Sequence, residues 1–385
     1  MTGKAVKPPA ILHLHSTFAA GGKELRCVQL INAFGKHARH SIVSAVPERM
    51  EAAKLISRSV SVNYPESFPL LQGKPTPGRL HKIARAMTAY DLVLTYNWGA
   101  MDAVMAHTLF AQTMTLPPLI HHEDGFNEDE RKRLKPLRNL YRRIALGKAQ
   151  GLVVPSEQLE EIALETWQQP MNKVKRIGNG INTRAFAMRP KGNALPGVRK
   201  SEGDLWVGTL AGLRAVKNLP RLVRAFAPLD TAWQLVSVGD GPEKAAIEAE
   251  AKRLGIDDRV HLPGFVANPA RYVGLFDIFA LSSDTEQFPI SVVEAMAASV
   301  PVVSPSVGDV VDMVSNTNAR FITPAGDERA LSSALLNLSE NAAMRTEIGE
   351  ANRLKALAEF DEKSMVESYK RLYWMHMGLP QPTLD

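Results

Sequence analysis

The chain has 385 residues, with 46 Lys and Arg against 40 Asp and Glu and a formal net charge of +6. This length predicts two domains of roughly 150–200 residues each, and no stretch approaches the ~20 consecutive apolar residues of a membrane-spanning helix. Cys27 is the only cysteine, which excludes an intrachain disulfide and predicts no cysteine-based metal site.

Charge is unevenly distributed between the two halves. Residues 1–185 carry 25 Lys and Arg against 15 Asp and Glu, whereas the remainder carries 21 against 25. This difference reflects either chance surface composition or an anionic partner of the first half, such as a lipid surface or an acidic acceptor. The first apolar run, 10–14, is too short for a signal-peptide core, so a cytoplasmic location is expected.

Short apolar runs alternate with helical patterns along the first half. We expect a strand at 11–15, a glycine-containing loop and then a helix over 24–34. Further strands are expected at 41–46, 92–95, 119–122 and 151–155. Strands alternating with helices predict a parallel sheet with both faces covered.

The second half repeats this pattern. Strands are expected at 205–210, 233–238, 260–262, 278–281 and 300–304, and helices at 218–227, 243–254, 291–298 and 328–340. The chain is therefore predicted to form two doubly wound α/β domains facing a central cleft, with ligands at the carboxyl ends of the strands.

Domain boundaries follow from composition. The predicted domains are 1–183 and 204–361, joined by a linker, 184–203, that is rich in Pro, Gly and charge. The final segment, 362–385, begins with an amphipathic helix that is expected to pack back on the first domain.

The strongest chemical pattern lies at 282–297. A loop carrying Glu286 follows a strand, and a helix carrying Glu294 is expected to begin after Pro289. Free backbone N–H groups at Ile290 and Ser291 would then bind phosphate, with Glu294 in reach of a ribose and Glu286 in reach of a sugar. The alternative is an acidic residue that offsets the helix dipole beside an unrelated surface glutamate.

Arg214 and Lys217 follow the strand at 205–210 and precede a helix. Two cations at this spacing suit a diphosphate, and the alternative is a pair of solvated surface cations. In the first half, Gly21 and Gly22 form a loop suited to close approach of backbone to a phosphate or acceptor, or a plain helix cap.

Together these segments resemble glycosyltransferase family 4, whose members have the GT-B fold of two Rossmann-like domains. Glu286 and Glu294 match its E-x7-E signature, and 301–304 with Gly308 match its continuation. Gln287 and Asp309 stand where the family commonly has glycine. The resemblance covers nearly the whole chain, with its motifs in family order.

The resemblance implies a retaining transferase that needs no metal and no cofactor beyond its nucleotide-sugar co-substrate. Arg214 and Lys217 would neutralise the leaving diphosphate, Glu286 would contact the transferred sugar and Glu294 the ribose. One of His121, His122 and Asp124 would lie near the sugar. The remaining donor-binding residues implied by the resemblance are Gly21, Gly22, Gly239, Gly241, Pro242, Leu262, Phe265, Phe288, Pro289, Ile290 and Ser291.

The segment Arg131–Lys148 is basic, with apolar residues interleaved, and Pro136 is expected either to lie in the first turn of a helix or to break it. It predicts either a solvated helix face or contact with anionic lipid or a lipid-linked pyrophosphate acceptor at the inner face of the cytoplasmic membrane. Nucleic acid is not expected, because no aromatic platform or recognition motif accompanies the charge.

The function predicted from these patterns is transfer of a sugar from a nucleotide-sugar, UDP-linked ahead of GDP-linked, to a hydroxyl of a glycan, lipid-linked or glycolipid acceptor. Assembly of an exopolysaccharide or glycolipid is the expected setting. The alternatives are a nucleotide-sugar epimerase of the same fold, a non-catalytic nucleotide-sugar-binding partner of another transferase, and a phosphorylase-like enzyme with a lysine-bound cofactor.

Overall fold

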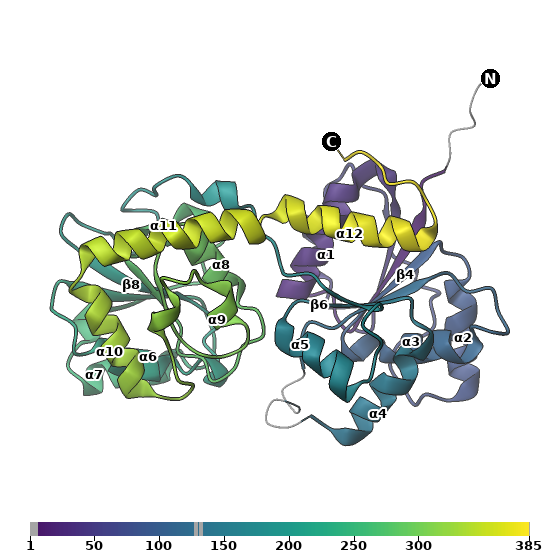
Figure 1. Ribbon diagram of the computed structural model, residues 1–385, viewed down its shortest axis with the longest axis horizontal. Coiled ribbons are helices and arrows are strands. Elements are labelled where there is room, and N and C mark those ends of the chain that lie inside the picture. Colours follow the sequence, from purple (N-terminus) through teal and green to yellow (C-terminus); the bar gives the residue numbers. More distant parts are fainter. Residues whose placement is uncertain (1–6, 127–129, 131–133, 385) are drawn as a thin grey trace. The chain divides into compact units, whose positions relative to one another are not determined.

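The computed structural model describes residues 7–126, 130 and 134–384 (Figure 1). It contains two compact units, one formed by the described residues up to Gly178 together with those from Met365 onward, and one formed by Asn179–Ser364. Within the described part of the chain, no helix combines the length and apolar character needed to cross a membrane.

The first unit is built on a seven-stranded parallel sheet with the order β3-β2-β1-β4-β5-β6-β7. Its strands are β1 (Ala10–His15), β2 (Arg39–Ser44), β3 (Val62–Asn63), β4 (Leu92–Tyr96), β5 (Leu119–His122), β6 (Gly151–Val154) and β7 (Val174–Arg176). Its helices are α1 (Gly22–Phe34), α2 (Pro77–Met87), α3 (Met101–Phe110), α4 (Pro136–Ala145), α5 (Glu157–Glu161) and most of α12 (Glu362–Met377).

The two faces of this sheet are covered by different helices (Figure 1). Side chains of α1 and α12 form one core with Ile11 of β1, and side chains of α2 and α3 form the other core with Leu12 of the same strand. Neighbouring residues of a strand point to opposite faces, so β1 contributes to both cores.

The second unit has a six-stranded parallel sheet with the order β10-β9-β8-β11-β12-β13. Its strands are β8 (Leu205–Leu210), β9 (Trp233–Val238), β10 (Val260–Gly264), β11 (Ile278–Ala280), β12 (Val302–Pro305) and β13 (Ile322–Thr323). Its helices are α6 (Leu219–Phe226), α7 (Lys244–Arg253), α8 (Ile290–Ala297), α9 (Val310–Met313), α10 (Glu328–Ser339) and α11 (Ala342–Glu359).

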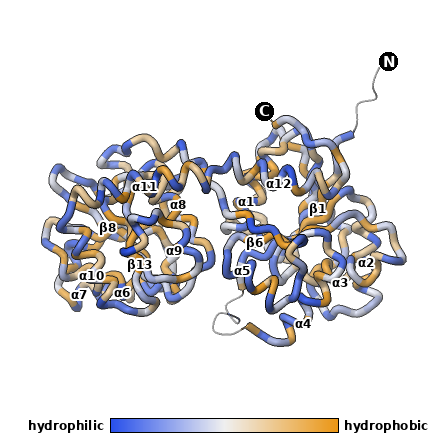
Figure 2. The backbone as a smooth tube through the Cα atoms, viewed as in Figure 1, coloured by the Kyte–Doolittle hydropathy of each residue, from blue (hydrophilic) through white to orange (hydrophobic). Residues whose placement is uncertain are grey.

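Helices α8 and α9 contribute to one core of this unit, and α6, α7 and α10 contribute to the other. Figure 2 shows the hydrophobic segments concentrated along the strands and on the helices that cover them. In both sheets the strand order reverses beside the first strand, the arrangement in which ligands bind at the carboxyl edge. The prediction of two doubly wound α/β domains is therefore confirmed.

The segment 184–203, predicted to be a linker, lies within the second unit. Leu195 is buried in the same core as Trp206, and Lys200 forms an ion pair with Asp277 at 2.5 Å. These contacts move the boundary to the bond between Gly178 and Asn179. A composition rich in Pro, Gly and charge marks an irregular backbone, but it does not show whether that backbone packs on a core.

Candidate active site

Four loops meet at the carboxyl edge of the second sheet. The loop after β8 is joined to the loop after β9, because the Leu213 amide donates to the Asp240 carbonyl at 2.9 Å. The Gly239 amide donates to the Gly264 carbonyl at 3.0 Å, and the Asp284 amide donates to the Val216 carbonyl at 2.9 Å. Hydrogen bonds thus run continuously across the loops that follow β8, β9, β10 and β11.

Gly239 and Gly241 allow two of these loops to approach closely. Their φ angles are +146° and +159°, and an added Cβ would lie 1.9 Å from the Ala211 carbonyl oxygen and 2.3 Å from the Leu213 carbonyl oxygen. The glycines therefore make room for the backbone of the loop after β8, while Gly241 and Pro242 remain exposed at the edge. Their predicted role in the donor pocket thus includes shaping the loop that carries Arg214.

Lys217 and Glu286 lie together in this edge. The Lys217 Nζ donates to Glu286 Oε1 at 2.5 Å, and the Ser283 hydroxyl donates to the same oxygen at 2.6 Å. Arg214 is exposed and has no ion pair or side-chain hydrogen bond among the described residues. Of the two predicted diphosphate-binding cations, Lys217 is therefore paired with a carboxylate, whereas the Arg214 guanidinium is available to a ligand.

A second set of contacts fixes the loop that carries Glu286. Asp284 forms an ion pair with Arg221 at 2.9 Å, and its carboxylate accepts a hydrogen bond from the Asn218 side-chain Nδ2 at 3.3 Å. The Ser282 hydroxyl donates to the Lys217 carbonyl at 2.9 Å. Sequence reasoning did not assign Ser283, Asp284, Asn218 or Arg221, although each lies within or directly beside the two motifs that it identified.

Helix α8 begins at Ile290, directly after Pro289 as predicted, and Pro289 is its N-cap. Glu294 lies in its second turn, half-buried, with no hydrogen-bond partner among the described residues, and burial raises the pKa of its carboxyl to about 7. Phe288 packs edge-on against Phe360, with ring centroids 5.6 Å apart, so the Phe288 ring packs against the core beneath the loop.

The departures from the family pattern at Gln287 and Asp309 are accommodated by Gly308. Its φ is +55°, and an added Cβ would lie 2.4 Å from the Gln287 carbonyl oxygen. The Asp309 amide donates to the same carbonyl at 3.0 Å.

In β10, Leu262 is half-buried. The Phe265 ring, just after this strand, is exposed, and the Phe265 backbone amide donates to the Asp240 carboxylate at 2.7 Å.

In the first unit, Gly21 is the N-cap of α1 and Gly22 is its first residue. An added Cβ on Gly21 would lie 2.8 Å from a carboxylate oxygen of Glu24, which is buried and paired with Lys23. Gly21 therefore leaves room for the Glu24 side chain to fold back over the start of the helix.

His121 and His122 end β5 and are buried, with 0% and 1% of their surfaces exposed. The His121 Nδ1 lies 2.8 Å from the Thr95 hydroxyl, and the His122 Nε2 lies 2.8 Å from the Tyr373 hydroxyl. Burial lowers the pKa of His122 well below its usual value. Both imidazoles are thus held inside the unit, and which of His121, His122 and Asp124 lies near the sugar stays a prediction.

Asp124 is the only partly exposed member of this predicted group. It forms a two-point ion pair with the buried Arg26 of α1, and its amide donates to the Asn97 side-chain oxygen at 2.8 Å. Asn97 has a φ of +54° and a ψ of −173°, a strained conformation for a residue with a side chain.

The basic segment Arg131–Lys148 divides into an inner and an outer face. Residues 131–133 lie outside the described residues. Arg142 is buried between Glu123 and Glu130, and Arg138 also pairs with Glu130 at 2.9 Å. Pro136 is the first residue of α4, as predicted. The outward side of α4 carries Leu137, Leu140 and Ile144, which are 81%, 52% and 50% exposed.

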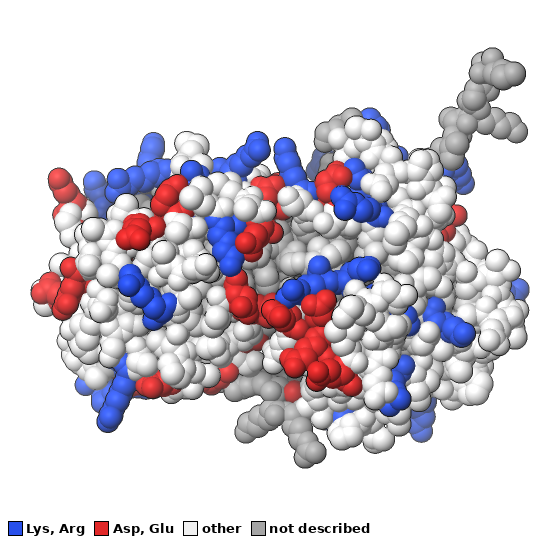
Figure 3. Space-filling model, in the orientation of Figure 1, with Lys and Arg blue, Asp and Glu red and all other residues white. Residues whose placement is uncertain are grey.

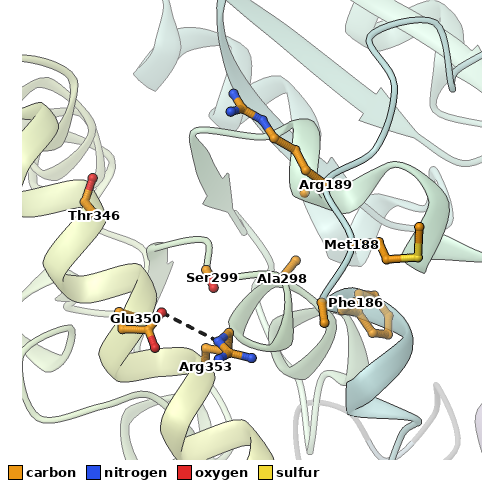
Figure 4. Close-up of a pocket in the computed structure, with 10 residues that line it drawn as sticks. Phe186, Met188, Arg189, Ala298, Ser299, Thr346, Glu350 and Arg353 are labelled. Carbon is orange, nitrogen blue, oxygen red and sulfur yellow. Dashed lines mark ion pairs between the residues drawn. The ribbon is translucent and has the colours of Figure 1, made fainter.

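A cavity of about 590 Å³ lies elsewhere in the second unit (Figure 4). It is lined by residues 186–189 and by Ala298, Ser299, Glu350 and Arg353, the last two forming an ion pair at 3.6 Å. Ala298 closes the C-terminal end of α8, whereas Glu286 and Glu294 lie before and within its N-terminal half. None of the predicted site residues lines this cavity.

The surplus of positive charge in residues 1–185 does not form one continuous patch on the face in Figure 3, where Lys and Arg side chains are interspersed with Asp and Glu side chains.

Residues 194–355 match the family model described as glycosyl transferases group 1, and residues 20–185 match the model described as Glycosyltransferase Family 4. The chain belongs to glycosyltransferase family 4. The two matches divide this family 4 chain close to the boundary between its units.

Curated relatives of this family 4 chain include N-acetyl-alpha-D-glucosaminyl L-malate synthase of Bacillus anthracis, 26% identical over 54% of this chain and 55% of the relative. The putative glycosyltransferase EpsF of Bacillus subtilis is 29% identical over 78% of this chain and 80% of the relative. The chain thus spans just over half the length of the first relative and four fifths of the second.

Among solved structures, Anabaena HepE in complex with UDP has a TM-score of 0.75 and 19% identity, covering 94% of this chain and 99% of that one. This likeness confirms the predicted GT-B fold of the family 4 chain.

Proposed function

We propose that the protein transfers a sugar from a nucleotide-sugar to an acceptor hydroxyl, with retention of anomeric configuration and no metal ion in the transfer step. The observation that carries this proposal is the Lys217–Glu286 pair beside the start of α8, with Arg214 unpaired on the same loop as Lys217. Positive charge and free helix N–H groups at one edge suit the diphosphate that leaves when the donor bond breaks.

Each residue of the edge has a distinct proposed role. Arg214 and Lys217 stabilise the leaving diphosphate, so no metal is needed to offset its charge. Glu294 accepts hydrogen bonds from the ribose hydroxyls. Glu286 positions the sugar, and the acceptor hydroxyl attacks from the face that the leaving group vacates. Glu286 is not proposed as a nucleophile, because Lys217 and Ser283 already hold one of its oxygens.

The donor is proposed to be UDP-linked ahead of GDP-linked. Support comes from the UDP bound to the structurally similar HepE and from the exposed Phe265 ring at the end of β10, where a nucleobase could stack. The name of the Bacillus anthracis relative indicates transfer of N-acetylglucosamine to malate, a small hydroxy acid. Acceptors of this family therefore include molecules that are not glycans.

The acceptor is proposed to be a glycan or lipid-linked hydroxyl that is presented at an anionic membrane surface. The outward stripe of α4 supports this proposal, because Leu137, Leu140 and Ile144 recur at helical spacing and remain exposed. Exposed Lys135, Arg143 and Lys148 border the stripe, and residues 134–150 include no acidic residue. Apolar contact and positive charge act together at such a surface.

The proposal is tested by measuring thermal stabilisation across nucleotides and nucleotide-sugars, each with and without a chelator. A donor at 100 times its Kd should add about 2.7 kcal/mol of stability, with the same value in the chelator. The best donor is then incubated with candidate acceptors, and the anomeric configuration of the product is read by NMR.

Four outcomes would contradict the proposal. An inverted anomer would exclude retention, and loss of turnover in the chelator would exclude metal independence. Conversion of the donor to an epimer in the absence of any acceptor would instead indicate the epimerase. A donor that binds but is never consumed would indicate the non-catalytic partner.

A further inference from the structure

Three side chains of types that can bind a metal ion meet in the core of the first unit, between β1 and α1. His13 and His15 lie two apart on β1, so both point to the sheet face that α1 covers. Cys27 is on α1. One ring nitrogen of each histidine and the Cys27 thiol all lie within 4.8 Å of one another. All three residues are buried, so the cluster is shielded from water.

His15 is the member whose environment is incomplete. It is 0% exposed, yet neither of its ring nitrogens has a hydrogen-bond partner among the residues that the structure describes. Its ring stacks on Tyr96 with centroids 4.0 Å apart and meets Phe18 at 4.9 Å. Burying a polar nitrogen without a partner is costly. A ligand that accepts the lone pair of one nitrogen would remove much of that cost.

His13 and Cys27 have the separation expected of two ligands on one metal ion. The His13 Nδ1 lies 3.4 Å from the Cys27 Sγ, and nitrogen and sulfur ligands on a tetrahedral zinc ion lie about 3.5 Å apart at ordinary bond lengths. The Tyr96 hydroxyl is 3.1 Å from the same nitrogen, which places an oxygen beside the cluster.

His40 supplies the support that a metal-bound histidine commonly has. A histidine ligand usually donates its second ring N–H to a neighbouring acceptor, which fixes the tautomer. The His13 Nε2 lies 2.9 Å from the His40 Nδ1. With the proton on His13 Nε2 and donated to His40, the lone pair of His13 Nδ1 is directed toward Cys27.

We propose that His13, His15 and Cys27 bind a transition-metal ion of the zinc class that fastens α1 to β1. A thiolate with two imidazoles selects zinc-like ions over Mg²⁺ or Ca²⁺, which prefer oxygen ligands. The Tyr96 hydroxyl, which lies beside the cluster, supplies an oxygen for a fourth position. The cysteine count alone argued against a metal site, but two histidines on one strand face supply the ligands that a second cysteine would have supplied.

The proposed ion is separate from the proposed transfer chemistry. The cluster belongs to the first unit, whereas Arg214, Lys217 and Glu286 belong to the second. Its role is to stabilise the fold, so donor binding in the second unit provides an independent readout.

The test uses the untagged full chain, freed of metal with a chelator and titrated with Co²⁺. Because Cys27 is the only cysteine, a near-ultraviolet thiolate-to-cobalt charge-transfer band can arise only from this residue. We expect about one Co²⁺ per chain, the band, and its loss when Zn²⁺ displaces the cobalt. A wild-type chain that remains folded by circular dichroism and shows no band would overturn the proposal without any variant.

Variants then assign the ligands. Cys27→Ser should lose the band, and His15→Gln should weaken Co²⁺ binding at least tenfold. The matched control is His107→Gln, since His107 is also buried but bonds to the Pro117 carbonyl at 2.9 Å, outside the cluster. Wild-type binding retained in His15→Gln, or lost equally in His107→Gln, would contradict the ligand assignment.

Discussion

Lys217 and Glu286 pair at the carboxyl edge of the second sheet although 69 residues separate them in the chain. Their side chains are 16% and 11% exposed, so the pair is shielded but reachable. A donor diphosphate would compete with Glu286 for Lys217, and a sugar hydroxyl would compete with Lys217 for Glu286. The pair therefore holds both side chains in place, and we expect a bound donor to replace their mutual contact.

Replacing Lys217 with Ala should lower turnover about 100-fold or more, because the developing charge on the diphosphate loses a fixed cation. Glu286→Gln should have an effect of similar size through loss of sugar positioning. Both are read from kcat with the best donor. The control is Lys244→Ala on α7, whose exposed side chain pairs only weakly with Glu248 at 4.0 Å. Full activity in either site variant would exclude the assigned roles.

Glu294 should make donor binding depend on pH, because burial raises the pKa of its carboxyl to about 7. Ribose hydroxyls donate to the ionised carboxylate, so donor affinity should rise as pH increases toward 7, by at most about tenfold per pH unit, and level off above 7. The measurement is Kd for the nucleotide-sugar from pH 5.5 to 8.5, a range of about three units around this pKa.

Glu294→Gln is the matched control, since the amide keeps the shape and cannot ionise. Its Kd should be flat across the same range. The pH dependence of stability provides an independent test. Between pH of about 4.5 and about 7, the Glu294 carboxyl keeps its proton in the folded state but has lost it in the unfolded state. The contribution of this group to the free energy of unfolding should therefore fall as pH rises through that range. An identical pH profile in both proteins would contradict the role of Glu294.

At the scale of elements, α4 combines an inner face held by charge with an outer face that has no covering element among the described residues. Arg138 and Arg142 turn inward to Glu130, and the Arg142 guanidinium also lies 4.9 Å from the Trp98 ring. The basic residues that sequence reasoning assigned to a lipid surface thus divide between a core role and a surface role. The predicted contact with an anionic membrane therefore depends mainly on the exposed apolar stripe of α4.

Leu137→Glu combined with Ile144→Glu should reduce binding to vesicles of phosphatidylglycerol and phosphatidylcholine at least tenfold, because two apolar contacts are replaced by negative charge. Binding is measured by cosedimentation. Leu354→Glu on α11 is the control, since Leu354 is similarly exposed but lies in the second unit. Donor affinity should be unchanged in all variants. Failure of the wild-type protein to bind anionic vesicles would overturn the membrane proposal.

At the scale of the whole molecule, each unit has its own pair of cores and the chain passes between the units twice. The C-terminal residues from Met365 complete the first unit, whose sheet would otherwise leave part of one face open. Tyr369, Tyr373 and Trp374 are buried there, and Trp374 meets Phe34 edge-on at 5.1 Å. The end of the chain is thus required by the unit that its beginning forms.

Trp374→Ala should cost about 3–5 kcal/mol of stability in the first unit, because it removes a large buried side chain. The neighbouring Met375→Ala should cost less than about 0.5 kcal/mol, since Met375 is 57% exposed. Calorimetry with and without donor separates the transitions, because the donor should shift that of the second unit. Equal effects of the two substitutions would contradict the packing described for α12.

Local sequence determined much of the fold, because the positions of helices and strands depend on hydrophobic periodicity and on residues with restricted backbones. The predicted helix at 291–298 is α8, shifted by one residue, because Pro289 limits where a helix can start. Most strands were predicted to within a few residues, since buried parallel strands are short apolar runs. The short strands β3, β7 and β13 were not predicted, because each has too few residues to form a pattern.

Tertiary structure alone decided which side chains meet. Periodicity places His13 and His15 on one face of β1, but only the packing of α1 brings Cys27 to them. Likewise, the order of strands brings Lys217 to Glu286, and the docking of α12 buries His122 beneath Tyr373. These contacts join residues far apart in the chain, so they depend on how sheets and helices assemble, which no local pattern of residues encodes.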